Sequence, residues 1–156
     1  MRNKNIMAQS LVSNYIHITF STKKRQKLID NQVEEELYSY LGGICKNLEC
    51  NPVMVGGHLD HVHILCTLSK KLPLTVLVEK LKANSSKWIK SKGKQYQNFY
   101  WQSGYGAFSV SSKQVEMLTK YIKKQKEHHQ NMSFLEEFVL ILKKHNVEYS
   151  LDYIID

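Results

Sequence analysis

Two histidines separated by one residue, His61 and His63, have the spacing of a metal-binding pair. Alternate side chains of a β-strand point to the same side, so both imidazoles can bind one metal ion. Further along the chain, Tyr121 precedes Gln125 by four positions. On a helix, this spacing places a hydroxyl nucleophile and a neutral oxygen ligand on one face. Together the two pairs predict a divalent metal site and a phenol that can attack a phosphodiester, as in DNA cleavage through a covalent tyrosine link.

The two histidines also have an ordinary structural interpretation, as surface residues on an exposed face of a sheet. Val62, Ile64 and Cys66 alternate with them and predict the buried face of the same strand. The histidines therefore project from the opposite, open side. Asp60, directly before them, is expected to form a turn, although its carboxylate could also orient an imidazole.

The remaining candidates are more simply explained by structure than by catalysis. Tyr121 alone falls at the border between the apolar stripe of its helix and solvent, where partly buried tyrosines are common. His17 lies on the polar face of a strand and could approach the same site, but His17 and His58 are expected to be surface residues. His128 and His129 lie near a helix C-terminus, where they are expected to favour the helix dipole or contact phosphate rather than bind metal.

Composition and charge favour a polyanionic partner. The 156 residues suit a single domain, 1–156, and 22 lysines and arginines against 14 acids give a formal net charge of +8. Nucleic acid is the leading candidate for such a partner, and a protein that is merely basic is the alternative. The predicted DNA contacts are Lys23, Lys24, Arg25, Lys87 and Lys90, with Trp88, Tyr96, Tyr100 and Trp101 as candidate stacking platforms. For each lysine a solvated face is the alternative, and for Trp88 it is core packing.

Cysteine usage and hydropathy bear on the compartment. Cys45, Cys50 and Cys66 form no C-x-x-C pair, which favours buried, reduced thiols over a disulfide framework or a zinc knuckle. No apolar run approaches the roughly 20 residues of a membrane span. Residues 1–10 are polar and lack a signal-peptide core. We therefore expect a cytoplasmic protein without a membrane partner.

The pattern of apolar residues predicts an α+β fold. The expected strands cover residues 15–20, 52–57, 61–68 and 99–110, and the expected helices cover residues 31–48, 73–90 and 111–127 and a last segment from residue 133. Ser111 with Gln114, and Ser133 with Glu136, resemble capping boxes at two of the helix starts. The tail, 148–156, is expected to be a short extended piece. The order of elements predicts a ferredoxin-like βαββαβ antiparallel sheet with helices on one face and additional C-terminal helices.

With these motifs in this order, the chain resembles the single-tyrosine transposases of the HUH nuclease superfamily. Within it the resemblance is to the insertion sequence two-hundred group and to relatives that act on repetitive extragenic palindromes (REP). It rests on His-Val-His at 61–63, Gly-Tyr-Gly-Ala-Phe-Ser at 104–109, Tyr-Ile-x-x-Gln at 121–125 and Ser-Phe-x-Glu-Glu-Phe at 133–138. One departure is the hairpin at 56–61, which reads Gly-Gly-His-Leu-Asp-His where many relatives have Met-Pro-Asp/Asn-His.

The resemblance implies a complete set of site residues and partners. His61, His63 and Gln125 would bind Mg²⁺ or Mn²⁺, and Tyr121 would form a 5′-phosphotyrosine while releasing a 3′-hydroxyl. The substrate would be single-stranded DNA that carries a hairpin, and the active form a homodimer. Two alternatives stay open: a non-catalytic single-stranded nucleic-acid-binding module of ferredoxin-like fold, and a rolling-circle-type HUH nickase, a class whose members are usually longer.

Overall fold

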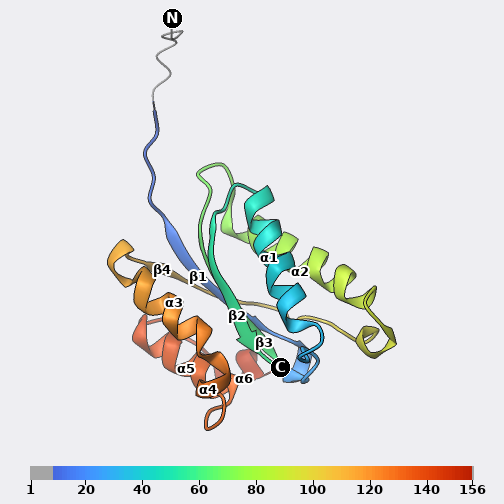
Figure 1. Ribbon diagram of the computed structural model, residues 1–156. Coiled ribbons are helices and arrows are strands. Elements are labelled where there is room, and N and C mark those ends of the chain that lie inside the picture. The colour runs from blue at the N-terminus through green and yellow to red at the C-terminus, as the bar shows by residue number, and fades with distance from the viewer. Residues whose placement is uncertain (1–8, 156) are drawn as a thin grey trace, which may run out of the picture.

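A four-stranded antiparallel sheet lies between two layers of helices in the computed structural model, which describes residues 9–155 (Figure 1). Of residues 1–10, which were expected to lack a signal-peptide core, residues 1–8 lie outside this range. The strands are β1 (Tyr15–Ser21), β2 (Pro52–His58), β3 (His61–Thr67) and β4 (Gly106–Val110). The helices are α1 (Glu34–Asn47), α2 (Leu74–Lys90), α3 (Val115–Lys123), α4 (Gln125–His128), α5 (Phe134–Lys144) and α6 (Leu151–Ile155). Among the described residues no helix is both long and apolar enough to cross a membrane.

The sheet confirms the predicted βαββαβ order. Its strands lie in the order β2-β3-β1-β4, so β1 pairs with both β3 and β4. The register sets Ile18 opposite Ile64 and Thr19 opposite His63. Alternation along the strands then gives one wholly apolar face and one face that carries the histidines.

Helices α1 and α2 cover the apolar face. Their stripes recur at helical spacing and are fully buried, Leu37 and Leu41 on α1 and Leu77 and Leu81 on α2. These side chains form one core with the even-numbered residues of β1 and β3. The three cysteines are buried and free, as their spacing predicts.

The second face of the sheet is closed by the C-terminal helices, and this overturns the prediction of an open face. His61 and His63 are 0% exposed and His17 is 4% exposed, so none of them is a surface residue. The helices can approach closely because β2 carries Gly56, where a Cβ atom would lie 2.9 Å from Ile122 Cγ2 on α3. A polar strand face can be buried here because its side chains bond to residues of the covering helices.

Four local predictions also differ from the structure. The expected strand at 99–110 is reduced to β4, because Gly104 turns the chain with a φ of 86° and Trp101 forms only an isolated bridge to Thr22. The expected helix at 111–127 breaks at Lys124 (φ −97°, ψ 20°) into α3 and α4. Ser111 makes no side-chain cap bond. The tail forms the short helix α6 rather than an extended piece.

A buried cluster of histidine, glutamate and tyrosine

The candidate site forms between the covered face of the sheet and the C-terminal helices, around the carboxylate of Glu137. Its members come from four elements: His61 and His63 from β3, Tyr121 from α3, Gln125 and His129 from α4 and its end, and Glu137 from α5. Ser133 caps α5 as predicted, since its Oγ accepts the backbone N–H of Glu136 at 3.1 Å. This cap fixes the start of α5 and so sets which of its side chains face the sheet.

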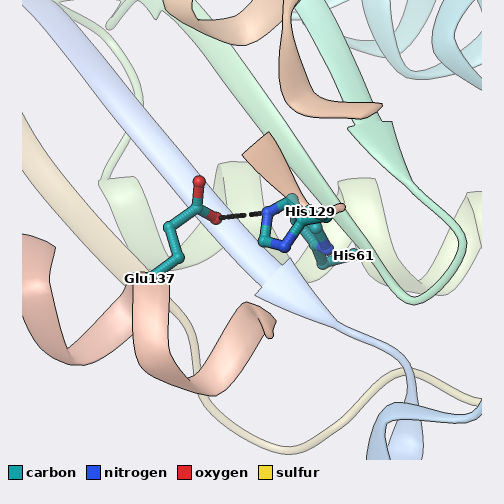
Figure 2. A group of neighbouring side chains, drawn as sticks. All are labelled: His61, His129 and Glu137. Carbon is teal, nitrogen blue, oxygen red and sulfur yellow. Dashed lines mark ion pairs between the residues drawn. The ribbon is translucent and has the colours of Figure 1, made fainter. Parts of the chain in front are cut away.

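One oxygen of Glu137 faces three imidazoles. Glu137 Oε1 lies 2.9 Å from His63 Nε2, 3.2 Å from His129 Nε2 and 3.6 Å from His61 Nε2. Figure 2 shows the carboxylate pointing at the ring of His129, with His61 beside that ring. His61, His129 and Glu137 alone bring three potential metal ligands within 4.8 Å of one another.

The other oxygen of Glu137 holds the candidate nucleophile. The Tyr121 hydroxyl donates a short hydrogen bond to Glu137 Oε2, and Gln125 Nε2 donates to the same oxygen at 3.0 Å. Gln125 Oε1 points the other way, 2.8 Å from His61 Nε2 and 3.0 Å from His129 Nε2. A single carboxylate therefore connects the tyrosine, the amide and the imidazoles.

The outward-facing nitrogens of these imidazoles also have partners. His61 Nδ1 lies 2.7 Å from Asp60 Oδ1, and His63 Nδ1 lies 2.8 Å from His17 Nε2. Asp60 was expected mainly to form the turn. In the structure it forms the turn and also orients the imidazole of His61. His17 belongs to the cluster rather than to the surface. Such outer hydrogen bonds fix the orientation of a ring and hold its inner nitrogen toward the site.

The electrostatics of the cluster favour an anionic Glu137 and a neutral tyrosine. Burial acts to raise the pKa of Glu137, but hydrogen bonds from His129 and His63 outweigh burial and hold that pKa far below its usual range. Burial, and then the carboxylate, raise the pKa of the Tyr121 hydroxyl well above its usual value. Burial lowers the pKa of His63, and burial together with His63 lowers the pKa of His17 to about 3. For His129, burial is outweighed by the carboxylate, and the pKa rises.

The structure brings together all four residues singled out by spacing, His61, His63, Tyr121 and Gln125. It adds His129, which was expected to favour the helix dipole or contact phosphate, and Glu137, for which no role was predicted. His129 follows Gln125 by four positions and so shares its helical face, a signal that was present in the sequence. Glu137 lies in the motif at 133–138, but that motif predicted no role for it, because its partners lie on other elements.

The predicted DNA contacts form two groups that meet at Tyr100. The backbone N–H of Lys23 donates to Tyr100 O at 2.8 Å, and Lys90 Nζ lies 4.0 Å from the centre of the Tyr100 ring. The ring itself is 52% exposed. Of the other candidate stacking residues, Tyr96 is buried, Trp88 stacks on Tyr40, and the Trp101 indole donates to Ser85.

This basic surface begins next to the histidine hairpin. The backbone N–H of Thr22 donates to Asp60 O at 2.8 Å, so the segment 23–25 follows directly from a contact with the turn that carries His61. Lys23, Lys24 and Lys87 are exposed. A polyanion lying over Tyr100 would therefore pass close to that turn.

Comparison with known proteins identifies the family. The profile of the family described as Transposase IS200 like matches residues 10–125, which include His61, His63, Tyr121 and Gln125. The chain belongs to this family of transposases. No curated protein matches the chain.

Two solved structures share the fold. One is a protein from Deinococcus radiodurans R1 described provisionally as a transposase, with a TM-score of 0.59 and 22% identity over 76% of this chain and 96% of that one. The other is a REP-associated tyrosine transposase bound to a REP hairpin, with a TM-score of 0.56 and 15% identity over 79% of this chain and 74% of that one. At these identities the likeness supports the fold, a four-stranded antiparallel sheet with helices.

Proposed function

We propose that this transposase cleaves and rejoins single-stranded DNA at hairpin-marked sites through a 5′-phosphotyrosine on Tyr121. His61, His63 and Gln125 would hold the Mg²⁺ or Mn²⁺ ion. The observation that carries the proposal is the shared carboxylate: Tyr121 bonds to one oxygen of Glu137 and His63 bonds to the other. Nucleophile and imidazoles therefore lie close enough to act on the same phosphate.

The donor atoms suit a divalent cation. In the buried cluster His61 Nε2 lies 2.8 Å from Gln125 Oε1, and His63 Nε2 lies 2.9 Å from Glu137 Oε1. When bound, such a cation polarises a non-bridging phosphate oxygen. A ligand set of two imidazoles and an amide is neutral, so the charge of the cation would act on the phosphate undiminished.

The chain itself supplies the nucleophile. The Tyr121 oxygen would attack phosphorus, lose its proton and displace the 3′-oxygen, which leaves as a 3′-hydroxyl. The new phosphotyrosine ester keeps the energy of the broken phosphodiester, so a second 3′-hydroxyl can reverse the step and join strands without ATP. A cavity of about 400 Å³ adjoins Tyr121, and its lining combines apolar side chains such as Leu118 and Leu140 with polar ones such as Gln114 and Lys144. In this proposal the nucleotide beside the scissile phosphate would lie in this cavity, next to the phenol.

The substrate and the assembly follow from the same proposal. One structural relative is bound to a REP hairpin, which supports a hairpin as the recognised feature. Each chain carries one candidate nucleophile, so two cleavages require two subunits, and we propose a homodimer. The net charge of +8 suits a DNA substrate.

The test is a covalent adduct. Purified protein is incubated with Mn²⁺ or Mg²⁺ and labelled single-stranded hairpin DNA from the sequence that flanks its gene, and the products are separated under denaturing conditions. We expect a labelled protein band that Tyr121→Phe abolishes. Tyr153→Phe is the matched control, because Tyr153 is 87% exposed on α6. DNA binding without any adduct would instead favour the non-catalytic module.

A further inference from the structure

We propose that His129 and Glu137 are also ligands of the cation, and that Glu137 holds the Tyr121 hydroxyl with its second oxygen while it does so. Both residues follow the segment 10–125 that the family profile matches. The cation site stands on its own contacts. Only the identity of Tyr121 as nucleophile rests on the proposed function.

The spacing of the inward-facing atoms is that of a coordination shell. The potential ligand atoms of three imidazoles, one amide and one carboxylate lie 2.8 to 3.6 Å from their neighbours. Ligands held about 2.1 Å from an octahedral cation are separated by about 3.0 Å along each edge of the octahedron. Gln125 Oε1 and Glu137 Oε1 each lie within 3.6 Å of both His61 Nε2 and His129 Nε2, distances that a single central cation can bridge, and His63 Nε2 adjoins this group through Glu137 Oε1 at 2.9 Å.

The outer partners of the imidazoles support the same conclusion. Asp60 Oδ1 and the carbonyl oxygen of Met132 are acceptors, 2.7 and 2.6 Å from the Nδ1 atoms of His61 and His129. Both Nδ1 atoms must therefore donate. Metal-binding histidines almost always donate their second N–H to a carboxylate or a backbone carbonyl, and His129 meets this criterion as fully as His61 does.

The inner nitrogens of the same two rings face acceptors. In the neutral form of each ring, a donating Nδ1 leaves a lone pair on Nε2. Each Nε2 lies close to the acceptor Gln125 Oε1, at 2.8 Å on His61 and 3.0 Å on His129. The amide is oriented by the bond from its nitrogen to Glu137 Oε2. Acceptors that face one another in a buried site require a proton or a cation between them, and a cation satisfies all of them at once.

Charge balance also favours a cation at Glu137. Its carboxylate is 2% exposed, and its described partners are imidazoles, a phenol and an amide. A buried carboxylate is costly unless it is paired or coordinates a metal. Three imidazoles with one carboxylate favour a transition metal such as Mn²⁺ over Mg²⁺, which prefers oxygen ligands. The anionic ligand would also lower the net charge that acts on the phosphate.

The first experiment measures Mn²⁺ affinity by calorimetry on chelator-treated protein. We expect Glu137→Gln and His129→Gln each to weaken Mn²⁺ binding at least tenfold. The matched control is the adjacent exposed residue, Glu136→Gln, which should bind Mn²⁺ within about twofold of the parent. Circular dichroism checks that each variant is folded. A folded Glu137→Gln protein that binds Mn²⁺ as tightly as the parent would overturn the role of Glu137.

The second experiment counts nitrogens. Pulsed electron paramagnetic resonance counts the imidazole nitrogens bound to Mn²⁺ in the parent and in His129→Gln, and we expect one fewer in the variant. Equal counts in the two proteins would exclude His129 as a ligand. If Tyr121 forms an adduct but Mn²⁺ affinity is unchanged in the Glu137 and His129 variants, this inference is wrong and the proposed function stands. If Mn²⁺ affinity depends on both residues but no adduct forms, this inference stands and the proposed function is wrong.

Discussion

Asp60 has two separate roles in the hairpin that carries His61. Its main-chain oxygen accepts the N–H of Thr22 at 2.8 Å, which joins the hairpin to the end of β1. Its side chain accepts from His61 Nδ1 at 2.7 Å. The first contact needs only a backbone, but the second needs a carboxylate at this position. The side chain can therefore be altered to test how far the orientation of one imidazole controls the site.

Removing that carboxylate should weaken the metal site more than the fold. We expect Asp60→Ala to reduce Mn²⁺ affinity about 10- to 100-fold, because losing the outer partner of a metal-binding histidine typically has this effect. Asp60→Asn keeps an acceptor and should show a smaller loss. Calorimetry measures the affinity, and Asp152→Asn on the exposed surface of α6 is the control. Equal affinity in Asp60→Ala and the parent would show that His61 needs no such partner.

Residue types and spacing predict only part of the cluster. His61 with His63, and Tyr121 with Gln125, are each close in sequence, so one regular element fixes their relative direction. Glu137 meets them only through packing of α5 against the sheet. Local patterns carry no information about which helix covers which face, and for this reason its role could not be predicted.

At the scale of elements, the start of α5 determines where Glu137 faces. Ser133→Ala should lower the free energy of unfolding by about 1 kcal/mol, because Ser133 Oγ accepts the N–H of Glu136. Ser111→Ala is the matched control, since Ser111 makes no side-chain cap bond before the turn at 112–114. Urea denaturation measures both. Equal losses at the two serines would show that the α5 cap contributes nothing specific.

Two glycines, one in the β2–β3 hairpin and one on α1, test how closely the chain packs at each place. A Cβ on Gly57 in β2 would overlap the carbonyl oxygen of His61 and lie 2.9 Å from Val62 Cα. Because both atoms belong to the backbone, Gly57→Ala should destabilise the protein by at least about 2 kcal/mol. A Cβ on Gly43, exposed within α1, meets no atom within 4 Å. Gly43→Ala should stabilise by about 0.5–1 kcal/mol, because alanine is the better helix former. Thermal melts distinguish the two signs.

The order of elements was predictable, but the second helical layer was not. Alternation on β1 and β3 identifies the apolar face, and the βαββαβ order assigns two helices to it. The other face is polar in sequence and so reads as exposed. It is buried because its polar groups find partners, as His17 does with His63. Hydrogen bonds between distant segments leave no periodic trace in a sequence.

At the scale of the whole molecule, the lysines that contribute to the charge of +8 lie at both ends of the sheet, and only one end carries the histidine hairpin. The backbone of Lys23 bonds to the backbone of Tyr100, and Lys90 Nζ lies 4.0 Å from the centre of the Tyr100 ring, beside the segment that leads to the histidine hairpin. Lys70, also exposed, follows β3 at the opposite end of the sheet, where the pairing of Tyr15 with Thr67 marks the start of β1. If charge alone governed DNA binding, these lysines would be interchangeable.

We expect Lys23 and Lys90 to contribute to DNA binding and Lys70 not to contribute. Lys23→Ala and Lys90→Ala should each weaken the binding of single-stranded DNA, and each should reduce the slope of log K against log salt concentration by about 0.7, the value for one phosphate contact on a single strand. Lys70→Ala removes the same charge and should leave the slope unchanged. Tyr100→Ala should weaken binding at every salt concentration by about 1–3 kcal/mol without altering the slope, because stacking releases no counterions. Fluorescence anisotropy at several salt concentrations measures all four variants. Equal slopes in the three lysine variants would mean that the DNA path does not cross Tyr100, whereas a slope lost only at Lys70 would place the path at the other end of the sheet.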